Sequence, residues 1–119
     1  MKQSFDDANL INWLDNAKAE DLDILDFGVV RMNYENTVMA YNDAECEISG
    51  FDKNNTIGKN FFVQVAPCTN NFMVSEKYKN DVLDETLPYI FTHITKPTKV
   101  ILRLLKGEMG YQYLLAKIA

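Results

Sequence analysis

The stretch YNDAECEISGFDKNNTIGKNFF, from Tyr41 to Phe62, holds the features that decide the fold of this chain. Residues 37–41, which lead into it, have the composition of a strand. Residues 42–48 can form one or two helical turns, and Gly50 would end them because glycine accepts the left-handed conformation common at helix C-termini. A strand followed by a short helix and a polar turn predicts a fold that mixes α and β elements.

The segments before this stretch predict a hairpin and a helical cap. Residues 27–32 have strand character, residues 33–36 form a polar turn, and residues 37–41 return as the second strand. Residues 5–18 place apolar side chains at helical spacing, which predicts one or two short amphipathic helices over the domain. Residues 21–26 read as a connector.

The segments after the stretch predict one helix and three more strands. Val74, Tyr78 and Val82 share a stripe, so we expect a helix over residues 75–85. Strands are predicted at residues 89–94, 98–105 and 111–118, the last two joined by a turn at residues 107–110. This order fits one five-stranded antiparallel sheet with flanking helices, in the α+β class.

Charge and composition exclude several classes of function. The chain has 119 residues and a net charge of −5, with 12 Lys and Arg against 17 Asp and Glu. Nucleic-acid binding needs a basic surface, and the sequence offers none. The basic residues of the late strand region are scattered and predicted to lie on a solvated sheet edge, namely Lys96, Lys99, Arg103 and Lys106.

The same composition gives expectations about compartment and redox state. No apolar run approaches the length of a membrane span, and the acidic, polar N-terminus does not resemble a signal peptide. We therefore expect a cytoplasmic protein. In a reducing compartment, Cys46 and Cys68 are expected to remain thiols rather than to form a disulfide.

Three polar side chains are predicted to share one face of the short helix. Tyr41, Glu45 and Ser49 follow at successive i, i+4 positions, so all three could hydrogen-bond to a single buried oxygen. Local interpretations stay open beside this one. Asn42 and Glu45 match a capping box, Tyr41 could be a core aromatic, Ser49 could simply end the helix, and Cys68 could be a small buried hydrophobe.

The motifs taken together resemble a known family. The stretch from Tyr41 to Phe62 is similar to the core of a PAS domain, and the continuation VAPCT at residues 65–69 narrows the resemblance. The chain resembles the photoactive yellow protein family, small blue-light receptors that carry p-coumaric acid on a cysteine thioester. The resemblance extends over one domain, with a cap at residues 1–25 and a PAS core at residues 26–119, and it implies the PAS fold.

The resemblance also assigns roles to individual residues. Cys68 matches the cysteine that carries the chromophore, while Tyr41 and Glu45 match the residues that hydrogen-bond its phenolate oxygen. Ser49 stands where a threonine commonly supports the tyrosine. The residues that match the walls of the chromophore pocket are Phe61, Phe62, Val65, Ala66, Pro67, Tyr89 and Phe91.

A light-driven proton transfer follows from those roles. The phenol of the chromophore has an ordinary pKa near ~10, so it needs strong donors to stay ionised in a buried site. Glu45 can donate only when protonated, which requires a pKa well above ~4.3. Isomerisation would then draw the proton from Glu45, and the buried carboxylate would favour opening of the cap. The resemblance implies a sensor rather than an enzyme, with an unknown downstream signalling protein, no nucleic-acid or membrane partner, and a monomer or weak dimer.

Three positions depart from the well-studied members of the family. Phe51 stands where those members carry an arginine at the pocket mouth, and His93 replaces a tyrosine. Thr95 stands where a methionine assists re-isomerisation, so we expect slow dark recovery.

Rival interpretations remain at this stage. The chain could be a PAS module for ligand sensing or dimerisation that holds no covalent chromophore. A thiol enzyme is disfavoured because no motif ties His93, the single histidine, to Cys68. Two cysteines and one histidine at irregular spacing also argue against a closed zinc site.

Overall fold

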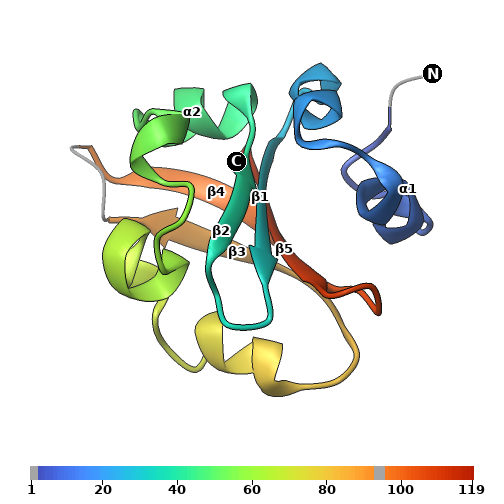
Figure 1. Ribbon diagram of the computed structural model, residues 1–119. Coiled ribbons are helices and arrows are strands. Elements are labelled where there is room, and N and C mark those ends of the chain that lie inside the picture. The colour runs from blue at the N-terminus through green and yellow to red at the C-terminus, as the bar shows by residue number, and fades with distance from the viewer. Residues whose placement is uncertain (1–2, 93–95) are drawn as a thin grey trace.

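The computed structural model describes residues 3–92 and 96–119 as helices and turns around one antiparallel sheet (Figure 1). Five strands hydrogen-bond in the order β2-β1-β5-β4-β3. Their bounds are β1 Gly28–Asn33, β2 Val38–Tyr41, β3 Leu83–Phe91, β4 Thr98–Lys106 and β5 Tyr111–Ile118. The predicted five-stranded α+β fold is confirmed, together with the β1–β2 and β4–β5 hairpins.

The sheet buries side chains on both of its faces, because residues along a strand alternate between them. In β1, Val29 packs on one face and Val30 on the other, and both are fully buried. The first face is covered by α1 (Leu10–Asn16) and the 3-10 helix η1 (Ala19–Ile24), which form the N-terminal cap (Figure 1). We call it the cap face. The segment predicted as a connector at residues 21–26 is thus largely helical.

The opposite face carries α2 and a chain of short turns, and we call it the site face (Figure 1). Its elements after β2 are α2 Asp43–Ser49, η2 Lys53–Asn55, η3 Phe61–Val65, η4 Pro67–Thr69 and η5 Ser75–Lys79. The prediction for α2 is confirmed within a residue. The Asn42 side chain accepts the Glu45 N–H at the helix start, and Gly50 ends the helix with a φ of 79°.

The helix predicted over residues 75–85 is wrong. Only a 3-10 helix, η5, forms there, and β3 begins at Leu83. Nine residues of β3 pair with β4, from Leu83 opposite Lys106 to Phe91 opposite Thr98. Val82, which the helical stripe would have buried, is 85% exposed. Long-range strand pairing has therefore overridden the local helical period.

The prediction that Arg103 lies on a solvated edge is also wrong. β4 is an inner strand, and Arg103 points to the cap face with only 5% exposure. Its guanidinium donates to both carboxylate oxygens of Asp84 at 2.9 Å and to the main-chain carbonyls of Phe5 and Asp7. Lys99 is exposed as expected.

Arg31 holds the cap from the neighbouring part of the sheet. It is 6% exposed and donates to the carbonyls of Leu14 and Ala17 at 2.6 and 2.7 Å, at the end of α1. Its guanidinium also lies over the Tyr111 ring, 4.7 Å from the centroid. Two buried arginines therefore bind the cap through its main chain.

Candidate functional site

The site face brings Tyr41, Glu45 and Ser49 together in a buried position at α2. Their exposed fractions are 2%, 1% and 6%. The Tyr41 hydroxyl donates to Ser49 Oγ at 2.7 Å, as the shared helical face predicts. Burial and the neighbouring Glu45 raise the pKa of the Tyr41 phenol, although the Ser49 hydrogen bond opposes this effect. Tyr41 is therefore neutral at physiological pH.

Glu45 is a buried carboxyl group with incomplete hydrogen bonding. Its Oε1 atom has no hydrogen-bond partner among the residues that the structure describes. Burial raises the pKa of Glu45 from 4.5 to about 8, and the neighbouring Tyr41 lowers it only in part. At neutral pH the protonated carboxyl group predominates, so Glu45 can act as a hydrogen-bond donor.

Gly28 makes room for this carboxyl group on the first residue of β1. A Cβ atom at position 28 would collide with Glu45 Oε1 and lie 3.1 Å from Glu45 Cδ. Any other residue would therefore displace the side chain of Glu45. No pattern in the sequence indicates this role, because β1 and α2 meet only in the folded chain.

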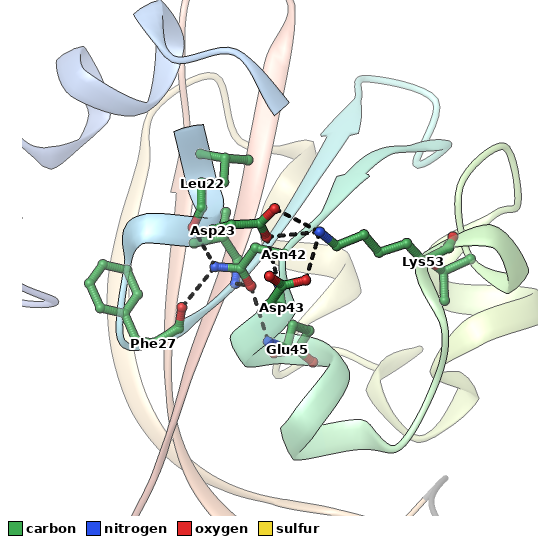
Figure 2. Close-up of polar contacts among 9 residues, drawn as sticks. Leu22, Asp23, Phe27, Asn42, Asp43, Glu45 and Lys53 are labelled. Carbon is green, nitrogen blue, oxygen red and sulfur yellow. Dashed lines mark hydrogen bonds and ion pairs between the residues drawn. The ribbon is translucent and has the colours of Figure 1, made fainter. Parts of the chain in front are cut away.

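The capping-box interpretation of Glu45 holds only for its main chain. Asn42 Oδ1 accepts the N–H groups of Val29 and Glu45 at 2.8 and 3.0 Å. Its amide nitrogen donates to the carbonyls of Leu22 and Phe27 at 2.9 and 3.0 Å (Figure 2). The N–H of Asn42 itself bonds the carbonyl of Val29, so the Glu45 side chain does not return to it. Asn42 instead joins the cap, β1 and α2 at one buried point.

An ion-pair cluster lies beside this network, and the sequence pattern did not predict it. Lys53 Nζ contacts carboxylate oxygens of Asp23 at 2.7 Å and of Asp43 at 2.8 Å. Asp23 also accepts the N–H of Asp43 at 2.7 Å. Figure 2 shows the three side chains meeting from η1, α2 and η2. These contacts form a second, partly exposed link between the cap and the start of α2.

Cys68 lies in η4, which follows the π-helical turn η3 in the chain. Asn60 starts η3 by accepting the N–H groups of Phe62 and Val63, both at 3.0 Å. Cys68 is partly buried and packs against the same hydrophobic core that contains Tyr41. Cys46 and Cys68 are not joined by a disulfide, in agreement with the expectation of thiols.

Most residues predicted to wall the pocket lie in that core. The fully or almost fully buried members are Phe61, Phe62, Val65, Ala66 and Phe91. Phe51 and Tyr89 pack against the core from partly buried positions. Pro67 differs, because its side chain is exposed and it begins η4, where its fixed φ suits the first position of a helical turn.

Two residues singled out in the sequence, His93 and Thr95, lie outside the described residues. Within residues 3–92 and 96–119, no group of three or more His, Cys, Asp or Glu side chains could hold a metal ion. In the same part of the chain, no helix combines the length and the apolar character needed to cross a bilayer.

The comparisons with known proteins agree with the geometry. The sequence is 35% identical to the photoactive yellow protein of Halochromatium salexigens over 92% of this chain and 90% of the relative. It is 32% identical to that of Rhodothalassium salexigens over 84% of this chain and 86% of the relative. This chain belongs to the photoactive yellow protein family. No family model matches the sequence.

A solved structure supports the same assignment. The photoactive yellow protein domain of the sensor histidine kinase Ppr from Rhodospirillum centenum superimposes with a TM-score of 0.81 at 25% identity. The match covers 90% of this chain and 98% of that domain. The chain therefore has the PAS fold of the photoactive yellow proteins, and this membership supports a photoreceptor role.

Proposed function

We propose that this member of the photoactive yellow protein family is a blue-light photoreceptor whose chromophore is p-coumaric acid, joined to Cys68 by a thioester. The observation that carries the proposal is the buried carboxyl group of Glu45, which lies beside Tyr41 and whose Oε1 has no partner among the described residues. A protonated carboxyl group and a neutral phenol suit one shared acceptor, such as a phenolate oxygen. When bound, p-coumaric acid supplies absorption of visible light and isomerisation about its double bond.

Attachment needs an activated form of the acid, such as an acyl anhydride or another thioester. Cys68 Sγ would attack the acyl carbon, the new S–C bond would form, and the bond to the leaving group would break. The thiol proton departs with the leaving group, so the reaction needs no oxidant or reductant. The partly buried position of Cys68 against the core that contains Tyr41 and Phe91 supports this assignment.

A buried anion at this site would be stabilised by hydrogen bonds from Tyr41 and Glu45, with Ser49 supporting Tyr41. A phenol hydroxyl has a single hydrogen, and in the structure Tyr41 uses it to donate a hydrogen bond to Ser49 Oγ. With an anion beside it, Tyr41 would donate to the anion and the Ser49 hydroxyl would rotate to donate to Tyr41. Glu45 supplies the second donor through its own proton, since its pKa lies at about 8.

Light would convert Glu45 from donor to carboxylate. Once Glu45 releases its proton, a charge remains in a site that is 1% exposed, which costs several kcal/mol without a partner. Asn42 hydrogen-bonds both the main chain of Glu45 and the carbonyl of Leu22 in the cap. A displacement of Glu45 would therefore be transmitted to the cap through Asn42. We propose that the cap opens in response and that a downstream signalling protein recognises the opened state.

Dark recovery is slow because Thr95 offers no soft thioether contact. The protein acts as a sensor without turnover, in the cytoplasm, as a monomer or weak dimer, with no nucleic-acid or membrane partner. The net charge of −5 supports the absence of a nucleic-acid partner.

Reconstitution tests the proposal directly. The apoprotein is mixed with activated p-coumaric acid, and its mass and visible spectrum are recorded. We expect one added p-coumaroyl group and a blue absorption band that bleaches in light and returns slowly. The Cys68→Ser variant should show neither change, while Cys46→Ser should behave as the wild type. An unmodified Cys68 and a colourless protein would favour a PAS module without a covalent chromophore.

A further inference from the structure

The main-chain carbonyl of Cys68 lies in a closed ring of hydrogen bonds. The Tyr89 hydroxyl, from β3, donates to this carbonyl at 2.6 Å. Asn71 Nδ2 donates to the same oxygen at 3.1 Å and to the Tyr89 hydroxyl at 2.7 Å. An amide group has two hydrogens and a carbonyl oxygen has two lone pairs, so all three hydrogen bonds can form at the same time.

The other end of the Asn71 side chain is equally occupied. Asn71 Oδ1 accepts the N–H groups of Met73 and Val74 at 2.9 and 3.2 Å, before η5. All four hydrogen-bonding positions of the side chain are thus filled. If the Asn71 amide were rotated by half a turn, its hydrogens would face the N–H groups of Met73 and Val74. The bonds therefore fix both the position and the orientation of Asn71.

The peptide group after Cys68 is held at both of its polar atoms. Its oxygen is the carbonyl bound by Asn71 and Tyr89, and its nitrogen belongs to Thr69. The Thr69 N–H donates to the carbonyl of Ala66 at 2.9 Å, and the Thr69 hydroxyl donates to the same carbonyl at 2.7 Å. Thr69 is fully buried. The peptide plane next to the Sγ-bearing residue therefore cannot turn without breaking bonds to β3, to Ala66 and to the loop before η5.

We infer that Asn71, acting with Tyr89, is a positioning residue that keeps the attachment point of the chromophore stationary. This inference rests on the proposed function. Isomerisation would twist the tethered group between Cys68 at one end and the hydrogen bonds of Glu45 at the other. A fixed Cys68 confines that twist to the chromophore, so that it disturbs the hydrogen bonds at the Glu45 end. A yielding Cys68 would absorb the motion in η4, and fewer absorbed photons would change the charge of Glu45.

Two variants distinguish the positioning of Cys68 from the hydrogen bonds that Asn71 accepts just before η5. Asn71→Asp keeps an acceptor for Met73 and Val74 but loses the donor to Cys68, while Tyr89→Phe removes the other donor and leaves Asn71 intact. Asn70→Asp is the matched control. Asn70 is an exposed neighbour whose side chain accepts only the Ser75 hydroxyl among the bonds described.

The first measurement uses the apoproteins and does not depend on the chromophore. Amide hydrogen exchange at Thr69 is followed by NMR, with the amide of Leu114 in the fully buried part of β5 as the reference. We expect Asn71→Asp and Tyr89→Phe to speed exchange at Thr69 at least fivefold and to leave Leu114 unchanged. Equal acceleration at Thr69 and Leu114 would show general destabilisation and overturn the inference. The inference would also fail if Thr69 exchanged no faster in Asn71→Asp and Tyr89→Phe than in the control Asn70→Asp.

The second measurement uses the p-coumaroylated proteins. We expect the fraction of absorbed photons that bleach the protein to fall at least threefold in Asn71→Asp and Tyr89→Phe, and to stay unchanged in Asn70→Asp. Unchanged bleaching with faster exchange at Thr69 would overturn the inference while leaving the photoreceptor proposal intact. If the wild type fails to bind p-coumarate, the photoreceptor proposal fails, and the inference fails with it even if the exchange data confirm the ring of bonds.

Discussion

The two faces of the sheet both bury ionisable side chains, but they treat the charge in opposite ways. On the cap face, Arg103 is paired with Asp84 and also donates to two carbonyls of the cap. On the site face, Glu45 is buried with an oxygen that has no partner among the described residues. A charge that is well paired stays charged, whereas an unsupported carboxyl group stays neutral until something forces it to ionise.

Arg31 refines this comparison, because its Nε also lacks a partner in the described part of the chain. Its terminal nitrogen nevertheless donates to two carbonyls, and the guanidinium lies over an aromatic ring. Arginine remains protonated in proteins, so an incomplete set of bonds does not remove its charge. The two buried arginines of the cap face therefore keep their charge, whereas the carboxyl group of Glu45 on the site face is able to change its charge.

The largest expected effect concerns the pH dependence that Glu45 gives the apoprotein. Its pKa in the folded state is raised from 4.5 to about 8, so the folded protein holds this proton more tightly than the unfolded chain. The contribution is complete below pH 4.5 and is lost as the pH rises to about 8, on the order of 3–5 kcal/mol in all. We expect Glu45→Gln to remove this loss, as measured by urea unfolding between pH 5 and pH 8.

Glu47→Gln is the matched control, since Glu47 is exposed on the same helix. The unfolding free energy of the wild type should fall steadily relative to that of Glu45→Gln as the pH rises, while Glu47→Gln follows the wild type. Parallel curves for wild type and Glu45→Gln would contradict the account of the site face.

The next effect is expected at Asn42, where the two faces are joined. Asn42→Ala leaves the buried N–H groups of Val29 and Glu45, and two carbonyls, without the partners they now have. Loss of a helix cap with buried donors left unpaired should cost about 3 kcal/mol. Urea unfolding measures the loss, and Asn54→Ala, at an exposed asparagine, should change little. A cost below about 1 kcal/mol would argue against a shared junction.

A smaller effect is expected from the cap face itself. Arg103→Met removes the donors to Phe5, Asp7 and Asp84 but keeps much of the apolar stem, so we expect a loss of about 2 kcal/mol. Proteolysis in the cap should become faster in this variant. Lys99→Met, at an exposed position of the same strand, serves as the control. Equal cap proteolysis in the two variants would show that Arg103 does not hold the cap.

The smallest effect is expected from the partly exposed ion pairs of Lys53. Lys53→Met should cost about 0.5–1 kcal/mol at low salt, because exposed pairs contribute little and are screened. The cost should shrink in 1 M NaCl, since Asp23 and Asp43 are then screened in both proteins. Lys59→Met, at an exposed lysine in the turn after η2, provides the comparison. A cost that does not depend on salt would mean that Lys53 acts through packing.

Much of the fold could be predicted because its signals are local. The strand composition of residues 37–41 and the pair Asn42 and Gly50 predict the boundaries of β2 and α2, and the structure agrees with them to within a residue. The failure at residues 75–85 has a non-local cause. β3 forms because β4 pairs with it along nine positions, and no local sequence pattern predicts that pairing.

The candidate site divides in the same way. The approach of Tyr41 to Ser49 follows from helical spacing alone, and the structure confirms it. The space that Gly28 leaves for Glu45 depends on contacts between elements that the sequence does not join, and so does the bond from Asn71 to Cys68. Arg103 shows the limit most plainly, because a buried arginine and a surface arginine look the same in a sequence.

The measurement that tests the central claim most directly is a light-minus-dark infrared difference spectrum of the p-coumaroylated protein. The account predicts that light removes the carbonyl stretch of a protonated carboxylic acid, and that this band is absent from the spectrum of Glu45→Gln. A difference spectrum without a protonated carboxyl band, or one in which the band persists in Glu45→Gln, would contradict the proposal that Glu45 holds the proton in the dark.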